Sequence, residues 1–261
     1  MTLATQAMPL SWIYLSPHFD DVALSCGGLL WEQARRGESV GVWTLCAGNS
    51  PEAGLSPFAE SLHQRWQTGA HAPELRRQED LASCAVMGAG ARHFDLPDCI
   101  YRTDREGRPL YTSEEAIFEP LHPLEAPLVE ALSQELLSRM PEGVRLVSPL
   151  SVGGHVDHRL VRQVAVKAAA AAWLPLWFYV DYPYILKYAD QLPGLVGSGW
   201  TTHSFPVSAS GLSAWQNAIA AHASQISTFW PDLEAMREAI RQYCGQKDGV
   251  LLWRQELASS P

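Results

Sequence analysis

Residues 12–46, WIYLSPHFDDVALSCGGLLWEQARRGESVGVWTLC, decide the fold. Trp12–Ser16 and Val40–Cys46 are short apolar runs, a pattern that is typical of buried strands. Between them, Val22–Arg36 has apolar residues at helical spacing, and Gly37 suits the end of that helix. A strand, a helix and a strand in this order form a βαβ unit. The sequence therefore predicts a parallel sheet with a right-handed crossover.

The same alternation of strand and helix patterns continues along the chain. Further strands are expected at Arg92–Leu96, Val144–Pro149, Leu176–Val180 and, at a sheet edge, Phe205–Val207. Further helices are expected at Glu74–Met87, Leu128–Arg139, His158–Trp173, Ser213–Ser227 and Leu233–Tyr243. Long loops are expected at Asn49–Pro73, which has room for one helical turn, and at Pro97–Pro127. We therefore expect one α/β domain over residues 1–261, doubly wound, with a mostly parallel sheet and helices on both faces.

The composition limits the class of protein and its compartment. Lys and Arg number 19 and Asp and Glu 28, which gives a net charge of −9, and no more than two basic residues are adjacent. We therefore expect no binding to nucleic acid. Because no run approaches 18 apolar residues, we also expect no membrane span. Five cysteines without a Cys-x-x-Cys pair argue against a disulfide framework. Because Met1–Ser11 also lacks the pattern of a signal peptide, we expect a cytoplasmic protein.

Two groups of His and Asp residues directly follow predicted strands. Their members are His18, Asp20 and Asp21 after the first strand, and His155, Asp157 and His158 after the strand at Val144–Pro149. Ligands of doubly wound folds bind outside the carboxyl ends of the strands, so we expect both groups at one binding edge. Each group alone is a weak signal, because adjacent Asp residues before a helix are more often caps and a lone His-x-x-His at a helix start is seldom a metal site. Their pairing at one edge favours a functional site.

A metal centre is the chemistry that these residue types favour. One imidazole each from His18 and His158 and one carboxylate from Asp21 would leave an open position, which is the pattern of catalytic zinc. Fe²⁺, Mn²⁺, Co²⁺ and Ni²⁺ also suit such nitrogen and oxygen ligands.

The remaining members of the two groups suggest roles beside the metal. Asp20 is placed to act as a general base on a water that the metal activates. His155 can stabilise an oxyanion or protonate a leaving amine. Asp157 can orient an imidazole and keep it basic.

These motifs resemble those of the LmbE / PIG-L family of zinc-dependent de-N-acetylases. That family carries a His-Pro-Asp-Asp-Glu-type motif and a Gly-His-x-Asp-His motif, which here read PHFDDV at Pro17–Val22 and GHVDH at Gly154–His158. The likeness continues in Gly27-Gly28, Arg76-x-x-Glu79, Leu96-Pro97-Asp98 and Ser224-Gln225. Phe19 and Val22 stand where the family has Pro and Glu. Neither is a zinc ligand in the family pattern, so metal binding is expected to persist. The two substitutions are expected to affect the reaction rate and the choice of substrate more than metal binding.

The resemblance implies a Rossmann-like fold and hydrolysis of an N-acetyl group, usually from a glucosamine unit. It also implies a role for each matching residue. By analogy, His18, Asp21 and His158 hold zinc, Asp20 is the general base, His155 stabilises the oxyanion, and Arg76 and Asp98 face the substrate.

The favoured hypothesis is a zinc-dependent hydrolase whose substrate is a small N-acetylated amino sugar of the N-acetylglucosamine type, or its conjugate. Two alternatives stay open: an amidase that acts on a non-sugar acylated amine, and a catalytically inactive relative that binds sugar. The ten Trp residues suit the contacts of a homo-oligomer as well as core packing, so the sequence leaves the oligomeric state open.

Overall fold

The structure, a computed structural model, describes residues 10–52, 54–247 and 249–255. Most of Met1–Ser11, where no signal peptide is expected, lies outside the described residues. The described residues form a seven-stranded sheet in the order β3-β2-β1-β4-β5-β7-β6. The strands are β1 (Trp12–Ser16), β2 (Val40–Thr44), β3 (Gly90–His93), β4 (Arg145–Pro149), β5 (Leu176–Tyr179), β6 (Trp200–Phe205) and β7 (Val250–Gln255). The five strands from β3 to β5 are parallel, and β7 runs antiparallel to both β5 and β6.

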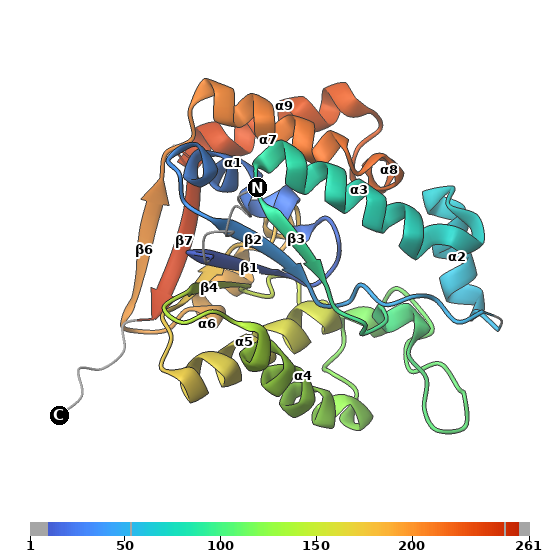
Figure 1. The fold of residues 1–261 in the computed structure, drawn as a ribbon. Coiled ribbons are helices and arrows are strands. Elements are labelled where there is room, and N and C mark those ends of the chain that lie inside the picture. The colour runs from blue at the N-terminus through green and yellow to red at the C-terminus, as the bar shows by residue number, and fades with distance from the viewer. Residues whose placement is uncertain (1–9, 53, 248, 256–261) are drawn as a thin grey trace, which may run out of the picture.

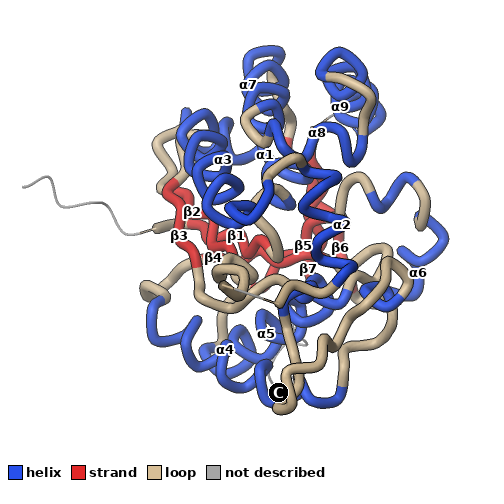
Figure 2. Tube along the Cα trace, turned by 90° about the vertical axis from the view of Figure 1, so that its right-hand side faces the viewer, coloured by secondary structure: helices blue, strands red, loops and turns tan. Residues whose placement is uncertain are grey.

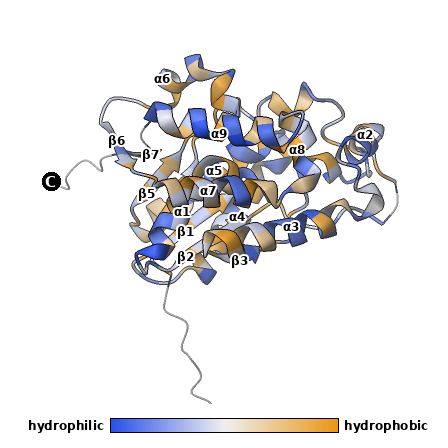
Figure 3. Cartoon of the chain, turned by 90° about the horizontal axis from the view of Figure 1, so that it is seen from above, coloured by the Kyte–Doolittle hydropathy of each residue, from blue (hydrophilic) through white to orange (hydrophobic). Residues whose placement is uncertain are grey.

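Helices cover both faces of this sheet (Figures 1 and 2). Helices α1 (Asp21–Arg35), α3 (Ala72–Met87), α7 (Ala209–Ala220) and α9 (Leu233–Lys247) pack on one face, and α4 (Ala126–Arg139) and α5 (Val156–Ala172) pack on the other. The remaining helices are α2 (Pro57–Trp66), α6 (Leu192–Leu195) and α8 (Ala223–Phe229). Both hydrophilic and hydrophobic residues occur along α3 and α9, as expected for helices with one face on the sheet (Figure 3). The expected doubly wound, mostly parallel α/β fold is confirmed.

The β1 sequence shows why the first strand lies at the centre of the sheet. All five of its residues are buried. Trp12 and Tyr14 belong to the core under α1, whereas Ile13 and Leu15 belong to the core under α4 and α5. Because side chains alternate between the faces of a sheet, a continuous apolar run is what a strand covered on both faces requires.

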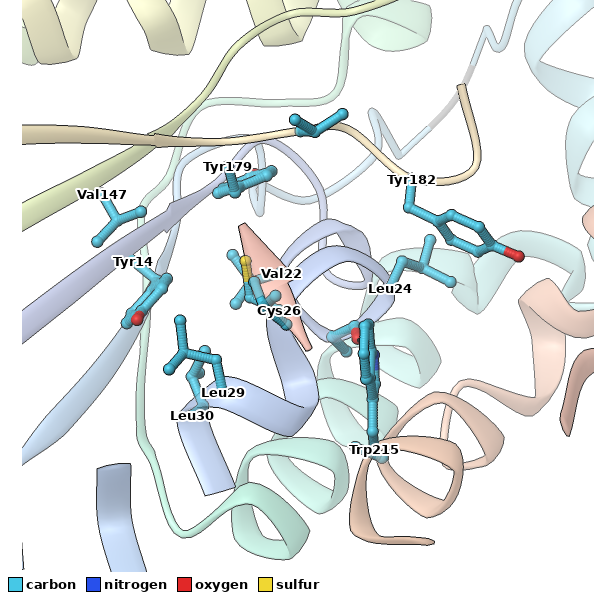
Figure 4. Packing of buried hydrophobic residues seen from close by; sticks show 14 of the residues in the cluster. Tyr14, Val22, Leu24, Cys26, Leu29, Leu30, Val147, Tyr179, Tyr182 and Trp215 are labelled. Atoms are coloured by element: carbon cyan, nitrogen blue, oxygen red, sulfur yellow. The ribbon is translucent and has the colours of Figure 1, made fainter. Parts of the chain in front are cut away.

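Gly27 and Gly28 allow α7 to approach α1 closely. A Cβ at Gly27 would lie 2.7 Å from Cδ1 of Trp215, and one at Gly28 would lie 2.8 Å from Cε3 of the same ring. The Trp215 ring lies in the core beside the residues of α1 (Figure 4). Its indole N–H donates to the Ala23 carbonyl at 2.7 Å. The lack of side chains at Gly27 and Gly28 thus allows α7 to pack directly on α1 of the first βαβ unit.

Several elements differ from the sequence-based expectation. Residues 57–66, expected as loop, form α2, whose start is marked by the Ser56 side chain accepting from the Ala59 N–H and by Pro57 in the first turn. The helix expected at 213–227 is divided into α7 and α8 at His222, whose backbone is not helical. Strands β3 and β6 begin earlier than expected. Strand β7 was not anticipated; it lies between β5 and β6.

Candidate active site

The candidate site lies where the strand order reverses. Strand β1 pairs with β2 on one side and with β4 on the other, so the chain leaves β1 and β4 in opposite directions across the sheet. The crevice outside the carboxyl ends of two such strands is the usual ligand site of open α/β sheets. Both His/Asp groups identified from the sequence follow these two strands.

The turn after β1 directs its polar side chains into the crevice. Asp21 Oδ2 accepts the backbone N–H of His18 at 2.7 Å, and the Ser16 hydroxyl accepts the N–H of Val22 at 3.2 Å. Asp20 occupies the N-cap position of α1, yet its side chain makes no capping hydrogen bond. A capping role therefore does not explain Asp20, which is 4% exposed.

The turn after β4 brings the second group to the same place. Ser151, Gly153 and Gly154 have positive φ angles, which turn the chain sharply before His155 at the N-cap of α5. His158 follows one helical turn later, so its imidazole lies on the same side of α5 as that of His155. The ring centroids of His18 and His155 are 4.9 Å apart.

His18, Asp21 and His158 converge on one point. One ligand atom from each lies within 4.8 Å of the other two, and all three residues are buried. The imidazole Nδ1 of His18 is 3.1 Å from Asp21 Oδ2, and Nε2 of His158 is 3.3 Å from Asp21 Oδ1. Within the described residues, His158 Nε2 is buried and no partner meets hydrogen-bond geometry. A buried nitrogen without a partner beside a carboxylate and a second imidazole fits a divalent transition metal.

A carboxylate stands behind each of the two imidazoles. Asp157 Oδ2 is 3.0 Å from Nε2 of His18, and Asp181 Oδ1 is 2.6 Å from Nδ1 of His158. Such carboxylates orient metal-binding imidazoles and raise their basicity. Sequence reasoning gave Asp157 this function without naming the ring, and it missed Asp181. Asp181 follows β5, so the rule that selected the other two groups also points to it.

Arg102 and Glu125 complete a buried chain of charges behind His18. Arg102 Nη2 lies 2.5 Å from Asp157 Oδ1, and Arg102 Nε lies 2.5 Å from Glu125 Oε1. The Tyr111 hydroxyl donates to the other Glu125 oxygen at 2.5 Å. All three come from the segment expected to be a long loop, and sequence reasoning identified none of them. Two further trios of possible ligands both include Asp157, but Arg102 already neutralises that carboxylate.

Buried carboxylates give this crevice a negative potential. Burial disfavours a charged His18, but Asp98, Asp157 and Asp21 outweigh it and raise the pKa of His18 well above the ordinary value. In the same way Asp21 and Asp181 outweigh burial at His158 and raise its pKa to about 9. A site that favours positive charge at two imidazoles favours a cation between them.

His155 differs from the other two histidines. Burial, together with repulsion from His18, holds the pKa of His155 well below its ordinary value, so the imidazole is neutral at pH 7. The Asp157 N–H donates to His155 Nδ1 at 3.2 Å. Because Nδ1 accepts that bond, the proton of the neutral ring is on Nε2.

A cavity of about 220 Å³ opens above the cluster. Among the residues that line it are the sequence-predicted His18, Asp20, Asp21, Arg76, Asp98 and His155, whereas Asp157 and His158 lie behind its wall. Arg76 Nη2 is 3.3 Å from Asp20 Oδ1, and Nη1 is 3.7 Å from Asp98 Oδ2. The Arg76 guanidinium also lies 4.8 Å from the ring centroid of Trp66 on α2.

The C-terminal part of the chain supplies the opposite wall. Gln225, Thr228 and Phe229 of α8 line the cavity. Both oxygens of Glu79 hold the start of this helix, accepting the Ser224 N–H at 2.8 Å and the Ser224 hydroxyl at 2.6 Å. The Arg76-x-x-Glu79 and Ser224-Gln225 motifs therefore meet in space.

The two departures from the family pattern lie away from the cluster. Val22 is fully buried in the core under α1. The Phe19 ring packs against His93, with centroids 5.3 Å apart, and lies 5.6 Å from the Arg76 guanidinium. Neither side chain occupies a position between the imidazoles.

Comparison with known families gives the class of the protein. Residues 13–169 match the PIG-L family of GlcNAc-PI de-N-acetylases, which is more than half of the chain. The chain belongs to this family, and the resemblance drawn from its motifs is confirmed. It is therefore a deacetylase, an enzyme that hydrolyses an amide bond.

Individual relatives extend this result. The chain is 29% identical to a 2′-N-acetylparomamine deacetylase of Niallia circulans over 73% of this chain and 72% of that protein. It is 32% identical to a deacetylase of the same name from Streptomyces fradiae, over 66% of this chain and 57% of that protein. A crystal structure of the zinc-inhibited form of a teicoplanin deacetylase superposes with a TM-score of 0.82 at 25% identity, covering 96% of this chain and 99% of the other.

Among the described residues, no helix combines the length and the apolar character that crossing a membrane requires.

Proposed function

We propose that this chain is a zinc-dependent hydrolase that removes the N-acetyl group from an amino sugar of the N-acetylglucosamine type, or from its conjugate. The observation that carries the proposal is the buried trio His18, Asp21 and His158 beside Asp20, of which His18, Asp20 and Asp21 line a cavity and His158 lies directly behind them. The relatives support the substrate class, because two of them are named as deacetylases of 2′-N-acetylparomamine and one of teicoplanin. We also infer one catalytic domain, since its sheet takes strands from Trp12 through Gln255.

His18, Asp21 and His158 would hold the metal. When bound, a zinc ion polarises the acetyl carbonyl and lowers the pKa of a water to about 7. The same ligand set accepts Fe²⁺, Mn²⁺, Co²⁺ and Ni²⁺, so the native ion is a matter for metal analysis.

Asp20 transfers the proton in this proposal. The Arg76 ion pair at 3.3 Å fixes one of its carboxylate oxygens at the cavity wall. As the water oxygen attacks the acetyl carbon, Asp20 accepts the proton of that water. It then delivers the proton to the nitrogen as the carbon–nitrogen bond breaks, which yields acetate and a free amine.

His155 stabilises the oxyanion. Its Nδ1 accepts the Asp157 N–H, so its Nε2 carries a proton that it can donate. The ring is neutral and buried in the cavity wall, so it offers this donor without reorganising during the reaction. The same lowered pKa makes it a poor choice for protonating the amine, which leaves that step to Asp20.

Metal analysis followed by a screen of N-acetylated compounds tests the proposal. The purified protein should contain about one divalent ion and release acetate from N-acetylated sugars, and a chelator should abolish the release. Asp20→Ala should retain the metal and lose several orders of magnitude in kcat, whereas Asp21→Ala and His158→Ala should lose the metal. Acetate release from non-sugar amides alone would favour the amidase alternative. Sugar binding by metal-loaded protein without acetate release would favour an inactive relative.

A further inference from the structure

Arg76 is held less firmly by charge than Arg102. The Arg102 guanidinium lies 2.5 Å from each of two carboxylates. Arg76 Nη2, in contrast, makes one long hydrogen bond, at 3.3 Å to Asp20 Oδ1, and Nη1 lies 3.7 Å from Asp98 Oδ2, beyond hydrogen-bond distance. Among the described residues, the buried Nε of Arg76 has no hydrogen-bond partner. These polar contacts alone therefore leave the plane of the Arg76 guanidinium poorly fixed.

Two aromatic rings supply further support. The Arg76 guanidinium lies 4.8 Å from the ring centroid of Trp66 and 5.6 Å from that of Phe19. Cation–π attraction and stacking on such rings act on the plane of a guanidinium group as well as on its position. The two rings differ in their access to a ligand, because Trp66 lines the cavity above the metal cluster and Phe19 does not.

The Phe19 ring is shielded from the cavity in which a substrate would bind. Phe19 is 4% exposed, and the hollow that it lines together with Arg76 has a volume of about 10 Å³, which is the size of one water molecule at most. Arg76 lines both this hollow and the larger cavity. An effect of the Phe19 ring on a bound substrate would therefore have to pass through a neighbouring side chain, and Arg76 is placed to transmit it.

The Phe19 ring is itself held in place from α3. It packs against the His93 imidazole with the ring centroids 5.3 Å apart and the ring planes at 74°. His93 Nε2 lies 2.6 Å from Asp80 Oδ2, and Asp80 is buried. Asp80 and Arg76 are four residues apart in α3, so they lie on the same side of that helix. The contacts thus begin and end on one helix, with the Phe19 ring between His93 and Arg76.

We propose that Phe19 is a positioning residue, whose ring fixes the plane of the Arg76 guanidinium and thereby the direction of the Asp20 carboxylate. The proposal rests on the proposed deacetylation and adds to it a residue whose side chain lies outside the cavity. It also gives a function to the aromatic side chain that stands where the family has Pro. Since Asp20 transfers the proton in the reaction, loss of the ring should lower kcat more than it raises KM.

Phe19→Leu tests this role, because it removes the ring and keeps an apolar side chain. The substrate is N-acetylglucosamine or N,N′-diacetylchitobiose, whichever the wild type cleaves faster. The variant should keep its zinc content and a KM within about twofold of wild type, and its kcat should fall about tenfold, the factor expected for the loss of one buried cation–π contact.

Phe94→Leu is the matched control. Phe94 is 2% exposed, and the Arg139 guanidinium lies 5.2 Å from its ring centroid, but this ring lies in the core under α4 and α5. The control variant therefore loses a buried ring and a cation–π contact away from the cavity. Its melting temperature should fall about as much as that of Phe19→Leu, whereas its kcat should stay within about twofold of wild type.

A double-mutant cycle shows whether the effect of Phe19 passes through Arg76. Arg76→Lys keeps the charge and removes the planar group, so it should lower kcat by itself. Adding Phe19→Leu should lower kcat further by less than about twofold, because no guanidinium is left for the ring to orient. The unfolding midpoints of the same four proteins in guanidinium should also be non-additive, which detects the contact without catalysis.

The outcomes separate this proposal from the deacetylation. If the wild type cleaves either sugar but Phe19→Leu keeps its kcat, or if the effects of Phe19→Leu and Arg76→Lys on kcat multiply, the positioning role is refuted and the deacetylation stands. If the metal-loaded wild type cleaves acetanilide and neither sugar, the sugar substrate is refuted, and the same cycle measured on acetanilide decides the positioning role. Cleavage of none of the three compounds would refute both.

Discussion

Replacement of Arg102 by Met tests whether the buried chain of charges holds the metal ligands in place. Arg102 is 7% exposed and lies 2.5 Å from both Asp157 and Glu125. Methionine fills much of the same space without charge, so Glu125 loses its cation and Asp157 keeps only the His18 imidazole, while both carboxylates stay buried. Removing one partner of a buried ion pair costs about 3–5 kcal/mol. We therefore expect the free energy of unfolding of the metal-free protein to fall by about this amount.

The same change should weaken metal binding. Asp157 Oδ2 holds the ring of His18 at 3.0 Å and accepts the Cys99 N–H at 3.0 Å, and among the described residues Arg102 is the contact that fixes Oδ1. The loss of such supporting contacts typically lowers metal affinity about 10- to 100-fold. Equilibrium unfolding in guanidinium gives the first quantity, and zinc titration against a competing chelator gives the second.

A double variant provides the control. Glu125→Gln in the Arg102→Met background removes one of the two orphaned charges, so the double variant should be more stable than Arg102→Met alone, and the two effects should not add. Unfolding free energy within about 0.5 kcal/mol of wild type, together with unchanged zinc affinity, would show that these ion pairs do not support the site.

Three further predictions concern other supports of the site. Asp181→Asn should weaken zinc binding at least about tenfold, because a neutral amide orients the bound imidazole less firmly; equal zinc affinity in a chelator titration would contradict this. Gly28→Ala should destabilise the protein by about 1–3 kcal/mol through overpacking against α7. Gly245→Ala in α9 is the control, because the added Cβ has no atom within 4 Å, and the variant should be as stable as the wild type or more stable. Equal changes in melting temperature for the two variants would argue against close packing of α7 on Gly28. Glu79→Ala should loosen α8, raising KM for a sugar substrate far more than it lowers zinc content; unchanged KM would show that α8 is held by other contacts.

Local patterns predicted the centre of the fold and most of the candidate site. The apolar runs at β1, β2 and β4 mark buried parallel strands, and His18, Asp21 and His158 follow two of them. Since the parallel strands of one sheet all end at the same edge, both groups could be expected at that edge, whereas their convergence depends on the pairing of β1 with β4. Asp181 follows β5 in the same way, but it stands alone in the sequence and was missed.

The long irregular segment after β3 could not be interpreted in this way. Arg102 contacts Asp157, 55 positions later, and Tyr111 contacts Glu125 across a segment whose only regular structure is two short 3-10 helices. No periodicity links such partners, since their pairing depends on the path of a loop through space. The position of β7 in the sheet could not be predicted for a related reason. This last strand inserts between β5 and β6, which both precede it in the chain.

The hydrogen bonds between Glu79 and Ser224 join two parts of the chain with different roles: one carries the groups proposed for hydrolysis, and the other lines the cavity that receives the substrate. The segment that matches the family, residues 13–169, contains the candidate metal ligands and the proposed base, while α8 comes after it and closes the cavity from the other side. We expect that exchanging the region around α8 between relatives would change which acetylated molecules fit the cavity. If Glu79 is kept to hold the new helix, the proposed metal ligands and base would stay unchanged. Such modularity offers a direct route to engineered deacetylases with new targets.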